Sequence, residues 1–265
     1  MTAWQPILTV ASGVPIGLQL GMTGTGGALL AVPLLVYIAG MTVQEAAAMS
    51  LVVVAASSLF GTWTFARAGE VNGRATLAFS WTGMIGAWVG AYGHHVIRKE
   101  ILLIGFGCLL LLARWLVARQ TALLKREPVS GSCPERFSTL CWIKASGMGL
   151  GIGLLNGFFG VGGGFMIVAA LVLTLGFPSR LAIGTSLSII TIIATTGVAG
   201  HLEFGVLDKR AASLVVLGSL IGMTAGTKIG HVASPSLVGL LTGVVTVSIA
   251  LALILFNAAK LAGFI

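Results

Sequence analysis

Two glycine clusters are the residues of this chain with the clearest capacity to bind a ligand. They read TGTGG at residues 23–27 and GVGGG at residues 160–164. Each glycine weakens a helix by about 1 kcal/mol relative to alanine, so both clusters are expected to interrupt a helix. A helix that restarts after an interruption presents unpaired N–H groups and the positive end of its dipole, which together attract an anion.

A backbone anion site needs glycine because a Cβ atom would fill the space that the anion occupies. The sequence therefore predicts a substrate site that uses main-chain groups rather than charged side chains. Its predicted members in the two clusters are Thr23, Gly24, Thr25, Gly26, Gly27, Gly160, Gly162, Gly163 and Gly164.

Several polar side chains stand close to the clusters in the sequence. Ser50 and the pair Thr185-Ser186 follow the two clusters at corresponding places, where their hydroxyls can cap a helix, contact a ligand or bond to their own helix. Asn156 lies in an apolar stretch, where its amide needs a partner, and we expect it to contact the ligand or a group that binds the ligand. His201 follows the apolar segment 181–200 and titrates near neutral pH, which makes it a candidate for proton coupling.

Some glycines have a simpler explanation in helix packing. Gly149, Gly153 and Gly157 recur every four residues, a spacing that lets two membrane helices approach closely. The run 162–164 differs, because three consecutive glycines make a poor helix and are not needed for packing. We expect the first set to pack and the second to break the helix.

The composition places these elements in a membrane. The chain has 265 residues, of which 57% are hydrophobic and 8% charged, against about 25% charged in soluble domains. A helix needs about 20 apolar residues to span a bilayer. Long apolar runs occupy residues 46–66, 75–93, 101–113, 145–176, 181–200, 211–227 and 237–259. The sequence predicts an all-α polytopic protein of the cell inner membrane, with the lipid bilayer as its surroundings.

The basic residues mark a linker rather than a nucleic-acid surface. The net charge is +8, and Arg119, Lys125, Arg126 and Arg136 gather in one polar stretch. Short loops rich in lysine and arginine stay on the cytoplasmic side. We predict an N-terminal transmembrane repeat at 1–118, a cytoplasmic linker at 119–143 and a C-terminal transmembrane repeat at 144–265, and no binding of nucleic acid.

The sequence holds no pattern typical of an enzyme. It has no Cys/His spacing of a metal site, no carboxylate pair in a spanning segment and no G-x-S-x-G motif. We expect no catalytic residue, no metal and no cofactor.

The two halves of the chain repeat one design. An offset of 136 residues aligns 13–95 with 149–231 without gaps, with 23 identities in 83 positions, 11 of them glycines. Each half opens with a glycine-broken stretch (7–40 and 145–176), and three spanning segments follow. Repeats of this kind are common in secondary transporters, which bind substrate at discontinuous helices between the repeats.

The path of the broken stretch decides the symmetry of the repeats. If it crosses the membrane once, each half has four crossings and the repeats are parallel. If it is a re-entrant hairpin, each half has three crossings and the repeats are inverted. Loop charges point both ways, and we predict the inverted arrangement.

The stretch GVGGGFMIVAALVLTLGFPSRLAIGTSLSII resembles the signature of the sulfite exporter TauE/SafE family, also called TSUP transporters. Its matching residues are Gly160, Gly162, Gly163, Gly164, Gly176, Ala182, Gly184, Thr185, Ser186 and Leu187. Ala169 stands where the family usually has proline, whereas the first half keeps that proline at Pro33 but has Ala28 for the third glycine and AMSL at 48–51. The resemblance implies transport of sulfite, sulfonates or related anions, often linked to the proton gradient.

The residues and the resemblance together predict a secondary transporter for a small sulfur-containing anion. We expect alternating access and proton coupling. Two alternatives stay open, a passive anion channel and a membrane-embedded assembly subunit that transports nothing. The anion, the direction of transport and the oligomeric state, a homodimer included, are left open.

Overall fold

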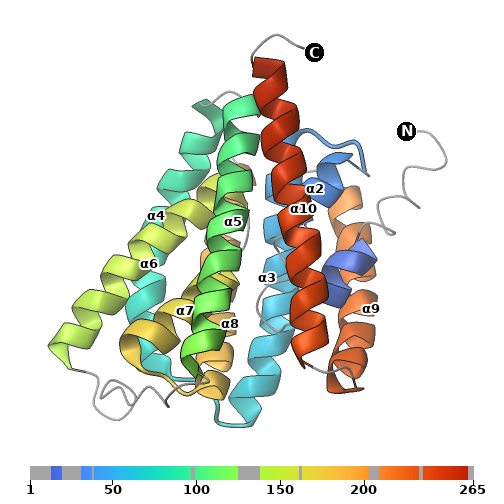
Figure 1. The fold of residues 1–265 in the computed structure, drawn as a ribbon. Coiled ribbons are helices and arrows are strands. Elements are labelled where there is room, and N and C mark those ends of the chain that lie inside the picture. The colour runs from blue at the N-terminus through green and yellow to red at the C-terminus, as the bar shows by residue number, and fades with distance from the viewer. Residues whose placement is uncertain are drawn as a thin grey trace.

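The computed structural model describes residues 13–19, 31–37, 39–96, 99–124, 138–160, 163–202, 209–232 and 235–261. Within these ranges the secondary structure is helical and holds no strand, which confirms the predicted all-α class. After a helical segment at 13–19 come α2 (Ala31–Tyr37), α3 (Val43–Arg67), α4 (Gly73–Val96), α5 (Lys99–Leu124), α6 (Thr139–Phe159), α7 (Gly164–Leu175), α8 (Ser179–Leu202), α9 (Lys209–Val232) and α10 (Pro235–Leu261) (Figure 1).

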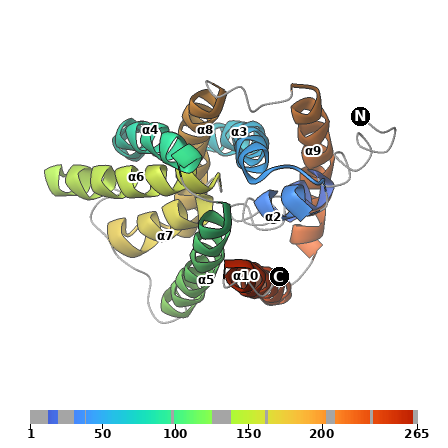
Figure 2. The same ribbon diagram turned by 90° about the horizontal axis from the view of Figure 1, so that it is seen from above.

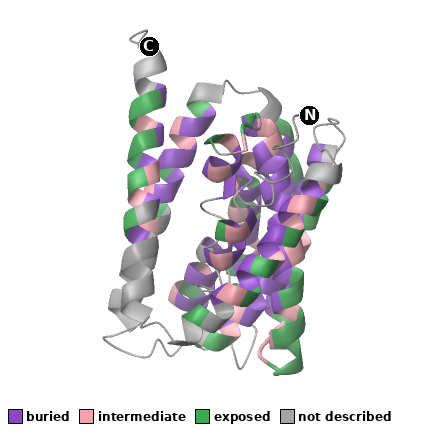
Figure 3. Ribbon diagram, turned by 90° about the vertical axis from the view of Figure 1, so that its right-hand side faces the viewer, coloured by how far each residue is buried: buried purple, intermediate pink, exposed green. Residues whose placement is uncertain are grey.

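The outer faces of the bundle carry large apolar side chains. On α4, Leu77, Trp81, Ile85 and Val89 follow one another at four-residue spacing, and each is more than half exposed. Buried residues gather on the inward faces of the helices (Figure 3). A contiguous apolar stripe of this kind needs a lipid or a protein partner to cover it. Its presence fits a polytopic membrane protein.

Two described helices satisfy a length and hydropathy test for crossing a membrane by themselves. They are α3, with a mean hydropathy of 1.6, and residues Arg180–His201 of α8, with 1.8. Shorter apolar stretches lie in α5, α7, α9 and α10. In both of them, 61% of the tested window is buried inside the protein.

Two helices extend into the residue range predicted as the linker. α5 continues to Leu124 and α6 begins at Thr139, so both helices extend into the range 119–143. The residues between them, 125–137, lie outside the described part of the chain.

Close glycine contacts join each half to the other. A Cβ atom on Gly153 of α6 would lie 2.2 Å from the carbonyl oxygen of Gly83 of α4, so the two backbones touch. A Cβ atom on Gly17 would lie 1.8 Å from the carbonyl oxygen of Ser219 of α9. These two contacts are related by the 136-residue offset. The opening helix of each half thus packs against the second of the three long helices that follow the broken stretch in the other half, α4 or α9.

The equivalent helices of the two halves pack against each other in opposite directions. Gly61 of α3 faces Leu187 of α8, and Gly197 of α8 faces Leu51 of α3, at 2.9 and 3.1 Å from an added Cβ atom. Because the residue numbers rise on one helix as they fall on the other, α3 and α8 are antiparallel. The pair α5 and α10 is also antiparallel, with Gly107 against Ala250 and Gly243 against Arg114. Both sets of contacts again repeat at the offset of 136.

The helices α6 and α7 form a hairpin. Gly163, at the start of α7, lies beside Ile152 and Asn156 of α6. At the other end of α7, the Thr174 hydroxyl lies 3.3 Å from the sulfur of Met148, which is farther back along α6. The chain therefore reverses direction between the two helices, and Figure 2 shows α6 between α4 and α7. α7 has 12 residues, about 18 Å, which is shorter than the about 30 Å core of a bilayer.

Candidate functional site

The reversal between α6 and α7 depends on two glycines with left-handed backbone. Gly160 ends α6 with φ +69°, and Gly163 precedes α7 with φ +54°. Other residues adopt this conformation at a cost of about 1–2 kcal/mol. The glycine cluster at 160–164 thus interrupts the helix, as its composition predicts. Gly164 begins α7, and Gly162 lies outside the described residues.

The start of α7 is buried and has no side-chain cap. Gly163 and Gly164 are both buried, and Gly163 at the N-cap position has no side chain with which to cap the first turn. The first intrahelical bonds run from the amides of Met166 and Ile167 to the Gly163 carbonyl, so the amides before them have no intrahelical acceptor. At the partly exposed start of α3, by contrast, Thr42 and Glu45 form a complete capping box. A buried helix start without a side-chain cap has N–H groups that a ligand can bond.

Asn156 lies directly beside this helix start. Its side chain is 1% exposed, and its amide carbon lies 3.9 Å from the position of a Cβ atom on Gly163. Neither Oδ1 nor Nδ2 has a hydrogen-bond partner among the described residues. A buried amide without partners costs about 1–3 kcal/mol for each unpaired group. Its position next to uncapped amides indicates that a ligand or a water completes its bonds.

Ser50 connects α3 to the break between α6 and α7. Its Oγ lies within hydrogen-bond distance of two carbonyl oxygens, that of Gly160 across the break and that of Ala47 in its own helix. The backbone of Ala47 also closes one side of the break, since a Cβ atom on Gly160 would lie 2.6 Å from its Cα. Ser50 thus holds the end of α6 against α3.

His201 connects the end of α8 to the last turn of α6. Its ring is fully buried, and Nε2 lies 3.3 Å from the Gly157 carbonyl oxygen, to which it donates. That carbonyl belongs to the last turn of α6, where carbonyls lack intrahelical donors. His201 therefore lies next to the break, since Gly157, the residue that it contacts on α6, directly follows Asn156.

Thr185 and Ser186 lie elsewhere. The Thr185 hydroxyl accepts a bond from the Asn72 amide at 3.0 Å and so fixes the loop before α4. The Ser186 hydroxyl donates to Ile183 of its own helix at 2.8 Å. Gly197 of α8 packs against Leu51 of α3, the residue next to Ser50. Ser186 lies about 16 Å from Gly197 along α8, and is therefore far from the break. The structure brings together Ser50, Asn156, Gly160, Gly163 and His201, and it does not bring Thr185 and Ser186 to them.

The predicted members of the first cluster, Thr23, Gly24, Thr25, Gly26 and Gly27, lie outside the described residues. The repeat nevertheless relates the two serines. Ser50 donates to Ala47 and Ser186 to Ile183, and both pairs are related by the offset of 136.

Sequence reasoning missed Ala47 and Ile152, which form the walls of the break. Both are small or apolar residues inside a uniformly apolar helix, so no chemical signal marks them. Their role follows only from the packing of α3 and α6 around the two glycines.

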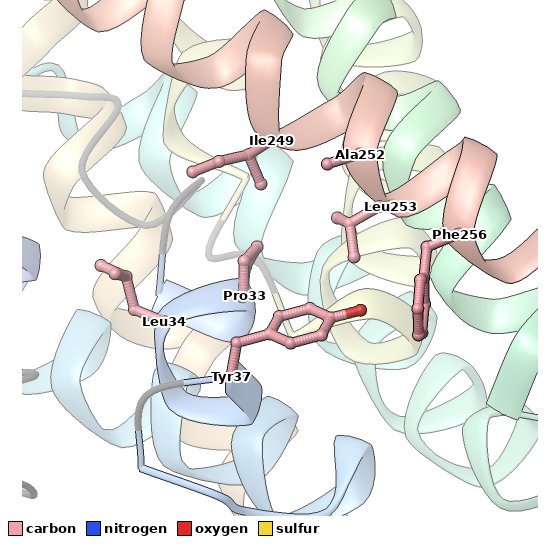
Figure 4. Close-up of a pocket in the computed structure, with 7 residues that line it drawn as sticks. All are labelled: Pro33, Leu34, Tyr37, Ile249, Ala252, Leu253 and Phe256. Atoms are coloured by element: carbon pink, nitrogen blue, oxygen red, sulfur yellow. The ribbon is translucent and has the colours of Figure 1, made fainter.

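An apolar pocket of 340 Å³ lies between α2 and α10 (Figure 4). Its lining residues are Pro33, Leu34, Tyr37, Ile249, Ala252, Leu253 and Phe256. The Tyr37 hydroxyl is the one side-chain polar group among them, so this pocket cannot compensate an anion for its lost water. The break between α6 and α7 is the better candidate for a polar ligand.

Comparisons with known proteins agree with the architecture. A model of the family described as sulfite exporter TauE/SafE matches residues 9–253. A probable membrane transporter protein of Xylella fastidiosa (strain 9a5c) is 30% identical over 257 residues, which cover 95% of each chain. The probable membrane transporter proteins YdhB and YunE of Bacillus subtilis (strain 168) are 27% and 24% identical, over 80% and 85% of this chain and 85% and 88% of their own. No solved structure matches the chain.

Proposed function

We propose that this chain, which belongs to the sulfite exporter TauE/SafE family, moves a small sulfur-containing oxyanion such as sulfite or a sulfonate across the inner membrane. The family match and the relatives make the chain a membrane transporter and not an enzyme. The cargo, its coupling to protons and the multi-pass inner-membrane location are our proposals.

The observation that carries the site is the buried amide of Asn156, which has no hydrogen-bond partner among the described residues and lies beside the start of α7. Backbone N–H groups and a helix dipole stabilise an anion without a charged side chain. The left-handed glycines Gly160 and Gly163 form the chain reversal that brings the start of α7 beside Asn156, and Ser50 bonds to the Gly160 carbonyl from α3. We therefore assign the substrate to this break, with Asn156 as its side-chain contact.

The helix directions support an inverted repeat. Two equivalent pairs, α3 with α8 and α5 with α10, are antiparallel. A two-fold axis in the membrane plane relates antiparallel helices, whereas an axis along the membrane normal relates parallel ones. The α6–α7 hairpin also leaves three long helices after it, the odd number that an inverted repeat requires. Such a repeat suits alternating access of the substrate site to the two sides.

Coupling to the proton gradient requires a proton carrier at the site. His201 is the titratable side chain whose contact with the end of α6 is described. The other carrier is the anion itself, if it binds with a proton. A His201→Gln variant distinguishes these two proton carriers. Glutamine keeps a donor for the Gly157 carbonyl but does not titrate between pH 5 and 8, so proton coupling is lost only if His201 carries the proton.

Anion flux into proteoliposomes tests the proposal. Purified full-length chain is reconstituted, and uptake of sulfite is compared with sulfate, acetate and chloride, with and without an imposed pH gradient. We expect saturable sulfite flux that the gradient drives. Unselective flux that ignores the gradient would favour a channel, and a folded protein without any oxyanion flux, recovered with a stable partner, would favour an assembly subunit.

A further inference from the structure

We propose that the break between α6 and α7 binds its oxyanion in a singly protonated form, so that the transported proton enters on the cargo. This inference rests on the proposed function and concerns the same site. The chemical class is a monoanion with one O–H group next to its charged oxygens, of which hydrogen sulfite is an example.

The first argument is the pair of unmet bonds on Asn156. Its Nδ2 donates and its Oδ1 accepts, and both are buried without a partner among the described residues. A ligand that satisfies both atoms presents an acceptor and a donor side by side. Fully ionised sulfite and the sulfonate group itself carry acceptors only, so they would leave Oδ1 buried and unpaired. A protonated oxyanion offers its O–H to Oδ1 and a charged oxygen to Nδ2.

The second argument is the charge of the surroundings. Among the described residues at the break, Ala47, Ser50, Ile152 and Asn156 carry no formal charge, and His201 is the titratable side chain brought to them, through its bond to the Gly157 carbonyl. The start of α7 supplies about half an elementary charge. The cost of moving an ion from water into protein grows with the square of its charge, so a dianion is disfavoured far more than a monoanion. The site thus matches one negative charge better than two.

The described titratable side chains near the break make no contact through which they could donate a proton to Oδ1 of Asn156. His201 on α8 directs its Nε2 to the Gly157 carbonyl, and Glu45 on α3 is held in the capping box with Thr42. The described residues of α7, Gly163 to Leu175, include no titratable side chain, and on α4 the side chains of His94 and His95 lie outside the described set. None of the described groups bonds to the Asn156 amide.

Measuring the affinity for two probes as a function of pH distinguishes a proton carried by the ligand from a proton carried by the protein. Sulfite gains a proton near neutral pH, whereas methanesulfonate is a monoanion of similar shape without an O–H group at any working pH. We expect the affinity for total sulfite to fall about tenfold for each pH unit above its second ionisation, following the hydrogen sulfite that remains. Methanesulfonate binding stays flat with pH, because any slope there would report a group of the protein.

Variants of Asn156 provide the second readout. The wild-type chain should prefer hydrogen sulfite over methanesulfonate by about tenfold, the effect of one buried hydrogen bond. Asn156→Leu removes both bonds, so this preference should fall to about one while methanesulfonate still binds. A ratio of two affinities is insensitive to a general loss of folded protein. His201→Gln should retain both the preference and the pH slope for sulfite.

Three results would overturn the inference. One is total-sulfite affinity that does not change with pH, which would mean that the dianion binds equally well. Another is an unchanged preference in Asn156→Leu, which would mean that water alone completes the amide. The third is loss of the pH slope in His201→Gln, which would assign the proton to the side chain. Absence of binding by either probe in folded protein would instead remove the proposed function itself.

Discussion

Replacing single glycines with alanine tests whether the break between α6 and α7 has the tight geometry described. At Gly160 the new Cβ atom would lie 2.6 Å from the Cα and 2.7 Å from the carbonyl oxygen of Ala47, where only backbone movement can make room. At Gly163 its nearest neighbour is a methyl group of Ile152 at 3.2 Å, which a rotamer change can move. Gly151 has no neighbour within 4 Å and lies on the exposed face of α6.

The free energies of unfolding should follow that order. Gly160→Ala combines left-handed strain of about 1–2 kcal/mol with overpacking of about 1–3 kcal/mol, for a total loss of about 2–5 kcal/mol. Gly163→Ala loses about 1–2 kcal/mol from the strain alone. Gly151→Ala gains up to about 1 kcal/mol, because alanine favours the helix.

Unfolding of each purified full-length variant in detergent, followed by tryptophan fluorescence, measures these differences. Gly151→Ala is the matched control, since it changes the same residue type in the same helix. If Gly160→Ala unfolds at the same denaturant concentration as Gly151→Ala, then the backbones of α3 and α6 do not meet at the break. The assignment of the site to that point would then have no geometric basis.

Three further predictions address the fold. Gly153→Ala should lower stability by about 1–3 kcal/mol, measured in the same unfolding assay, because its Cβ atom would meet a backbone oxygen of α4. Cysteines at Gly61 and Leu187 should form a disulfide on mild oxidation, seen as a mobility shift on gels, and a folded protein that stays reduced would contradict the antiparallel packing of α3 and α8. Arg180→Ala should change stability by less than about 1 kcal/mol, because its ion pair is 3.4 Å long and its side chain is 86% exposed, and a larger shift in the unfolding midpoint would show a network that these contacts do not contain.

The sequence predicted the helical class and the position of the second break because both depend on local chemistry. Consecutive glycines disfavour a helix whatever surrounds them, and α6 ends and α7 begins within the predicted cluster. Asn156 was identifiable because a lone amide in an apolar run needs a partner. These signals lie within a few residues of each other in the chain.

The roles of Thr185 and Ala47 could not be predicted in the same way. Thr185 matches the family signature, but its hydroxyl fixes the loop at Asn72, which is 113 residues away in the chain. Ala47 forms a wall of the break because α3 crosses the end of α6, and nothing in its own neighbourhood indicates that crossing. Both roles depend on long-range packing, which residue type and spacing in the sequence do not indicate.

The exchange of helix partners between the two halves has a consequence for how the chain is made. The helix at 13–19 is synthesised about 190 residues before its glycine-mediated partner α9. At typical synthesis rates that helix waits on the order of 10–40 s before its partner exists. Neither half can complete its own packing, so the first half must be held in the membrane unfinished until the second arrives. A chain that stops after the linker would therefore leave Gly13 and Gly17 without the α9 backbone against which they pack.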